Sequence, residues 1–154
     1  MARIAEKNPR FRSKEVLCSD LSKVLNSDLH FGTKMGVLNE IFWIWTEFEG
    51  KIIGCPYWSN EAKKAYTLDK KVKLIHEHLM PREIIRKMVF DLDQPTAEDL
   101  MNLFSKNLIG VVVTKEEDNR LNDLGLRSKM LDDWDGVDPW ARHEKANIVS
   151  NQVP

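Results

Sequence analysis

Residues 108–113 read LIGVVV, the most strand-like run in the chain, and they decide the expected fold. The run is short, apolar and rich in β-branched residues, as is typical of a strand in the middle of a sheet. Thr114 follows it and Glu117 stands three residues later, so the two side chains can cap the backbone N–H groups at the start of a helix. Gly125 is expected to end that helix, because glycine readily adopts the conformation that follows a helix C-terminus. The stretch predicts a buried strand that leads directly into a helix.

Two weaker strand signals and several helical patterns surround this unit. Residues 51–55 (KIIGC) and 72–75 (VKLI) are short apolar runs bounded by turn or polar residues, which favours strands. Apolar residues at helical spacing predict helices over residues 13–25, 33–49 and 60–66, and after Pro81 and Thr96. The sequence therefore predicts a helix-rich single domain of the α+β class, in which a small sheet of about three short strands is covered by five or six helices.

The chain divides into three regions by composition. Residues 1–12 are expected to be a flexible basic arm, and residues 13–125 to be the globular α+β domain. Residues 126–154 form an acidic tail, which Trp134 and Trp140 are expected to hold against the domain.

Composition and charge narrow the class of protein. The 154 residues are 42% hydrophobic and 31% charged, which is ordinary for a folded domain, and a net charge of -1 gives no overall field that attracts nucleic acid. The two cysteines, Cys18 and Cys55, lack the CxxC spacing of a zinc ribbon and do not form a disulfide framework. No signal-peptide pattern opens the chain and no apolar run reaches the length of a membrane span, so we expect a cytoplasmic protein without membrane contact.

Residues 72–82 (VKLIHEHLMPR) hold two of the four histidines, with a carboxylate between them. In a strand His76 and His78 would point to one face and Glu77 to the other. We expect an irregular segment after the strand over residues 72–75, and there any two of the three could meet at a metal ion. A neutral imidazole beside carboxylates can also act as a general base near neutral pH. The alternative interpretation is structural, with both histidines bonded to neighbouring backbone groups at a strand end.

Residues 77–81 (EHLMP) place an acidic residue, a histidine, an apolar residue and a proline in the order of the opening motif of HNH-type, ββα-metal nucleases, which this segment resembles. The resemblance implies that Glu77 ligates a divalent metal ion and that His78 activates water against a phosphodiester. It also implies that a second strand feeds a helix supplying the last ligand, here Asp118, with His76 as a further ligand or orienting group. The matching helix contains no histidine, so the chain would be a divergent or an inactive relative.

Two functional hypotheses follow. The first is an HNH-like nuclease that uses Mg²⁺ or Mn²⁺ and binds nucleic acid. Its phosphate contacts would come from the basic residues around the histidines, namely Arg82, Lys70, Lys71 and Lys73. The alternative is a non-catalytic protein-interaction or regulatory module, of a host-defence-related kind, supported by the near-neutral charge, the five tryptophans and the acidic, Trp-bearing tail as a docking surface for a protein partner. The nuclease hypothesis requires His78 and Asp118 to lie close together, and the alternative expects them far apart.

Overall fold

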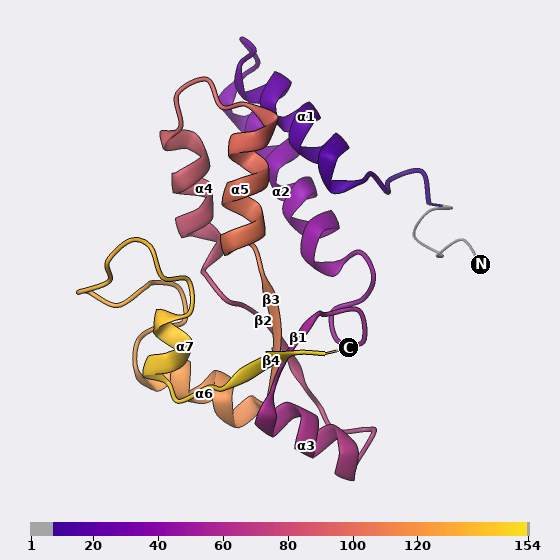
Figure 1. Cartoon of the computed structure of the whole chain (residues 1–154), viewed down its shortest axis with the longest axis vertical. Helices are drawn as coiled ribbons and strands as arrows, with labels where there is room; N and C mark the ends of the chain where they lie inside the picture. Colours follow the sequence, from indigo (N-terminus) through magenta and orange to yellow (C-terminus); the bar gives the residue numbers. More distant parts are fainter. Residues whose placement is uncertain (1–7, 154) are drawn as a thin grey trace.

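Four helices form the upper part of the molecule in Figure 1, in a computed structural model that describes residues 8–153. These helices are α1 (Lys14–Leu25), α2 (Phe31–Glu47), α4 (Arg82–Asp91) and α5 (Ala97–Asn107). Their apolar faces meet in one core, whose largest fully buried members include Leu21, Phe42, Ile85 and Phe104. Within residues 8–153, no helix is long and apolar enough to cross a membrane.

A mixed four-stranded sheet lies below these helices in Figure 1. Its strands, in spatial order, are β2 (Ile75–His78), β3 (Gly110–Val113), β1 (Tyr57–Ser59) and β4 (Ser150–Gln152). β3 pairs with β2 in antiparallel and with β1 in parallel orientation, and β4 pairs with β1 in antiparallel orientation. All four residues of β3 are buried, as expected of a central strand.

Helices cover both faces of the sheet. Val112 packs with Trp58 and with Ala62 of α3 (Asn60–Leu68) on one face. Val111 and Val113 point to the other face, where they pack with residues of α6 (Lys115–Asp123) and of the segment that carries α7 (Ala141–Lys145). The alternation of strand side chains thus gives β3 a separate small core on each side.

The predicted α+β class is confirmed, with four strands and seven helices in the described residues where about three strands and five or six helices were expected. The strand predicted over residues 51–55 is wrong, because these residues form turns. A Cβ added to Gly54 would lie 2.2 Å from the carbonyl oxygen of Glu49. The backbone therefore folds back on itself between these two residues and is not extended. The first strand begins after Pro56 instead.

Within residues 8–153, the first and the last residues contact the body of the protein. Residues 1–7 of the expected basic arm lie outside the described residues, but Arg10 and Arg12 form ion pairs with Glu40 of α2. The segment 126–153 supplies α7 and β4, and the ring of Trp140 lies 5.5 Å from that of Tyr57. The region expected to be an attached tail therefore contributes a strand to the sheet.

Candidate metal site at Glu47, His76 and His78

Strand β2 directs two imidazoles to the same face of the sheet. His76 and His78 are two residues apart, so their side chains share a face, opposite Val112 and Gly110 of β3. The missing Cβ of Gly110 makes room for one ring, because a Cβ there would lie 2.5 Å from Cε1 of His76. The ring centroids of the two histidines are 5.1 Å apart.

Glu47, the last residue of α2, brings a carboxylate to the two imidazoles. Its Oε1 atom lies 3.6 Å from Nε2 of His78, and its side chain is only 9% exposed. One ligand atom from each of Glu47, His76 and His78 can be chosen so that all three lie within 4.8 Å of one another. Among residues 8–153, this is the one group of three or more His, Cys, Asp and Glu side chains with that geometry.

Hydrogen bonding leaves one ring nitrogen of each histidine without a partner. Nδ1 of His76 lies 2.7 Å from the carbonyl oxygen of Lys51 and must donate to it, because that oxygen can only accept. Nε2 of His76 is therefore the unprotonated nitrogen; it is buried without a hydrogen-bond partner, as is Nδ1 of His78. A backbone carbonyl that fixes the tautomer of an imidazole is the usual support for a metal-ligating histidine.

The charge states also suit a cation. Interaction with His78 holds the pKa of Glu47 down at about 2, and the nearby ammonium of Lys51 acts in the same direction. The 3.6 Å between Oε1 of Glu47 and Nε2 of His78 is longer than an ordinary hydrogen bond, so this contact is mainly electrostatic. Burial lowers the pKa of His76. At neutral pH the site therefore offers an ionised carboxylate and a neutral imidazole, the forms that bind metals.

Glu77 does not join this group. It points to the opposite face of the sheet, where its carboxylate binds the guanidinium of Arg142, a side chain that is completely buried. Arg142 also donates to the carbonyl oxygens of His78 and Leu79 at the end of β2. The predicted metal ligand is thus an ion-pair partner that anchors the strand end.

Asp118 is likewise separate from the histidines. Its carboxylate lies 2.7 Å from the ammonium of Lys115, in the first turn of α6. Because β2 and β3 are antiparallel, the end of β3 that leads into α6 lies beside Ile75, while His78 lies beside the start of β3. The structure therefore brings together His76 and His78 but adds Glu47 in place of Glu77 and Asp118.

The predicted phosphate-binding residues are divided in the same way. Lys70, Lys71 and Lys73 precede β2, at the end of the strand opposite His78, and the ammonium of Lys70 lies 4.0 Å from the ring centroid of Tyr66. Arg82 is exposed at the start of α4, shortly after His78 in the chain. Of this set, only Arg82 follows the end of β2 that carries His78.

Comparisons of the chain with protein-family models, curated proteins and solved structures found no match.

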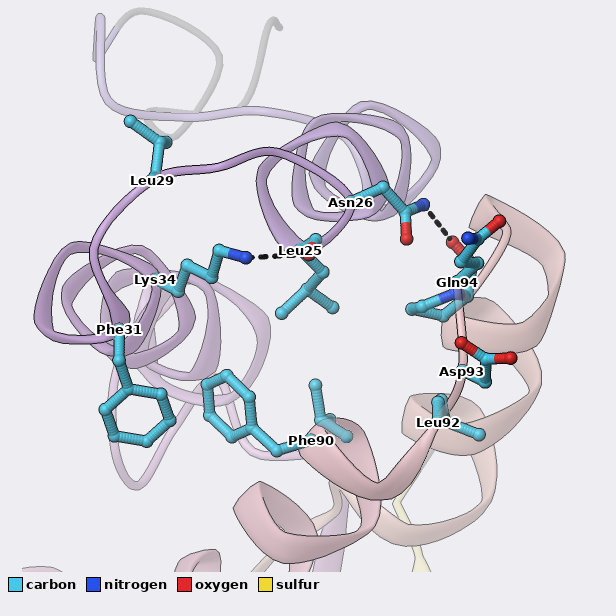
Figure 2. Close-up of a pocket in the computed structure, with 11 residues that line it drawn as sticks. Leu25, Asn26, Leu29, Phe31, Lys34, Phe90, Leu92, Asp93 and Gln94 are labelled. Atoms are coloured by element: carbon cyan, nitrogen blue, oxygen red, sulfur yellow. Dashed lines mark hydrogen bonds between the residues drawn. The ribbon is translucent and has the colours of Figure 1, made fainter.

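A separate hollow of about 430 Å³ lies at the far end of the helical layer (Figure 2). Leu25, Phe31 and Phe90 give it apolar walls, and the ring centroids of Phe31 and Phe90 are 4.8 Å apart. The ammonium of Lys34 donates to the carbonyl oxygens of Leu25 and Ser27, where it caps the end of α1. This hollow shares no residue with the candidate metal site, and Lys34 stabilises the end of α1.

Proposed function

We propose that this protein binds a divalent transition-metal ion through Glu47, His76 and His78. The proposal is supported chiefly by one observation: His76 and His78 each have a buried ring nitrogen without a hydrogen-bond partner, beside the ionised carboxylate of Glu47. A buried polar atom without a hydrogen bond costs about 1–3 kcal/mol, and a cation bound to Nε2 of His76 would satisfy that atom. The side chains of Glu47 and His78 are only 9% and 14% exposed, so little water competes with the protein ligands.

The ligand set indicates the class of metal. Imidazole nitrogen suits Zn²⁺, Fe²⁺, Co²⁺ and Ni²⁺, whereas Mg²⁺ prefers oxygen ligands and retains most of its water. Two imidazoles and one carboxylate are a common zinc ligand set. The proposal therefore replaces the Mg²⁺ or Mn²⁺ expected from the HNH resemblance with a zinc-like ion.

Calorimetric titration of the chelator-treated protein with Zn²⁺ tests the proposal. We expect one ion per chain for the wild type, and a loss of affinity of at least about 100-fold for His76→Ala and for His78→Ala, since loss of a mere supporting residue already costs about 10–100-fold. His30→Ala is the matched control, because His30 caps the first turn of α2 and lies outside the site. Equal binding by all four proteins, or no binding by the wild type, would refute the proposal.

Metal-dependent hydrolysis of phosphodiesters is a second candidate. The separation of His78 from Asp118 is what the non-catalytic alternative expects, so hydrolysis would need a different ligand set from that of the HNH resemblance. In its favour, the antiparallel strands β2 and β3, which α4 and α5 separate in the chain, are followed by α6. A metal ion held by three protein ligands keeps a position at which water can be activated as a nucleophile. Glu47, His76 and His78 would hold the ion, and exposed Arg82 would bind the phosphate.

Cleavage of DNA and RNA in Zn²⁺, Mn²⁺ or Mg²⁺ tests this second candidate. Activity in the wild type and in His30→Ala, with loss in His78→Ala, would support hydrolysis. Absence of cleavage with all three metals would leave the protein-interaction module as the remaining functional hypothesis, with metal binding as a property of its fold.

A further inference from the structure

Cys55 and His76 both lie beside the space above Gly110. A Cβ on Gly110 would lie 2.9 Å from Nε2 of His76 and 3.3 Å from Sγ of Cys55. The unprotonated nitrogen of His76 and the cysteine sulfur therefore border the same small volume, which exists because residue 110 has no side chain. Both atoms lie on the face of the sheet to which His78 points.

The thiol of Cys55 has only weak hydrogen-bond partners. Cys55 is 1% exposed and forms no disulfide; its sulfur donates to the carbonyl oxygen of Tyr57 at 3.6 Å and also contacts the backbone of Val112. A thiol is a weak hydrogen-bond donor, so these contacts offer little resistance to a metal ion. The nearby Nε2 of His76 is shielded from solvent and lacks a partner. Two potential ligands without strong partners thus lie beside each other.

The connection between α2 and β1 carries Cys55 to this place. Residues 48–56 contain neither helix nor strand, and the tight turn at Gly54 folds the connection back against Glu49. Glu47 and Cys55 consequently stand near the two ends of one irregular segment, and both approach β2. Cys55 is not within 4.8 Å of all three other ligand atoms, so its side chain must turn toward His76 to complete the site.

We infer that Cys55 is a fourth ligand of this metal site, an inference that rests on the proposed metal binding. On binding, the S–H bond breaks, a sulfur–metal bond forms and the proton leaves to solvent. Two nitrogens, one carboxylate oxygen and one thiolate make a closed tetrahedral set, which is typical of structural zinc. Thiolate ligation further selects zinc-like ions over Mg²⁺ and Ca²⁺.

A closed site has a different role from an open one. Four protein ligands leave no position for a reacting water, so the ion would join α2, the connection and β2 and would stabilise the fold. The inference therefore predicts that hydrolysis does not take place at this centre.

Cobalt absorption spectroscopy tests the inference directly. The chain has two cysteines, so Cys18→Ser leaves Cys55 as the sole thiol, and Cys55→Ser leaves Cys18, which is buried in α1. With Co²⁺ bound, we expect intense visible bands from tetrahedral cobalt in the wild type, and a near-ultraviolet band from thiolate-to-cobalt charge transfer. The charge-transfer band should persist in Cys18→Ser and vanish in Cys55→Ser. Cys55→Ala provides a second variant if the serine disturbs folding.

The outcomes separate the two proposals. Visible cobalt bands without a charge-transfer band in the wild type would overturn ligation by Cys55 and leave the three-ligand site intact. A charge-transfer band that survives both Cys55 variants would also overturn it. If Co²⁺ and Zn²⁺ do not bind to the wild type at all, the proposed function fails and the fourth ligand fails with it. A band lost only with Cys55, together with a Zn²⁺ affinity reduced at least about tenfold, would support the inference.

Discussion

Replacement of Arg142 by methionine removes the donors of five hydrogen bonds while keeping a side chain of similar length. The guanidinium is completely buried and binds the carboxylate of Glu77 and the carbonyl oxygen of His78. It also donates to three more carbonyl oxygens, those of Leu79 at 3.0 Å, Leu126 at 2.7 Å and Arg127 at 3.3 Å. Arg142 therefore joins the end of β2 to the segment that follows α6.

The size of the effect follows from the burial of these groups. Breaking a buried ion pair by removal of one partner costs about 3–5 kcal/mol, because the remaining charge and acceptors lose their partners. Glu77 is 16% exposed, so water can solvate part of its charge in the variant, but the carbonyl oxygens of Leu79 and Leu126 belong to buried residues. We expect Arg142→Met to lower the free energy of unfolding by about 3–5 kcal/mol and the Tm by roughly 6–20 °C.

Urea unfolding, followed by tryptophan fluorescence, measures this loss against a matched control. Arg10 donates to both carboxylate oxygens of Glu40, but its side chain is 57% exposed and that of Glu40 is 33% exposed. Arg10→Met should therefore lower the free energy of unfolding far less than Arg142→Met does, because water solvates the groups that lose their partners. If the two variants lose the same stability, the buried guanidinium does not hold the end of β2, and the assignment of Glu77 as its structural partner is wrong.

Three further predictions concern other buried groups. Burial, together with the charge of the adjacent arginine, lowers the pKa of His143 from 6.5 to about 3. Between these two pH values the unfolded chain therefore binds a proton at this residue and the folded chain does not. Stability should fall by about 1.4 kcal/mol for each pH unit below 6.5, and His143→Phe should remove this part of the slope in urea titrations at several pH values. Gly110→Ala should cost about 1–3 kcal/mol in urea unfolding, because its Cβ would displace the ring of His76, whereas Gly36→Ala in α2 has open space and should stabilise by about 0.5–1 kcal/mol. Glu117→Gln should lower the Tm by an amount equivalent to about 1.5–3 kcal/mol, because the buried carboxylate accepts a backbone N–H at 2.8 Å and a serine hydroxyl at 2.6 Å; an unchanged Tm would contradict this.

Local sequence signals predicted those elements whose stability is decided within a few residues. The capping box of Thr114 and Glu117 is present at the start of α6, and the strand signal of residues 108–113 marks the fully buried β3. The failure over residues 51–55 has a physical cause, because an apolar run does not reveal that a glycine within it packs against a carbonyl oxygen.

In the candidate metal site, too, the local sequence predicted some features and the tertiary structure decided the others. The strand was expected over residues 72–75, with the two histidines in an irregular segment after it, whereas β2 spans Ile75–His78. Because the histidines lie within the strand, they share a face and Glu77 takes the opposite one, so the prediction that Glu77 joins them in the site is wrong. Nothing near these residues in the chain pointed to Glu47, which is far away in sequence and reaches the histidines only because α2 ends above β2. The direction in which β2 and β3 pair decided that Asp118 lies away from His78. The sequence by itself determined the class of fold and the capping residues, because these depend on patterns and neighbours along the chain. Only the tertiary structure decided which carboxylate meets the imidazoles, because that depends on how α2 packs against β2, and these two elements are far apart in the chain.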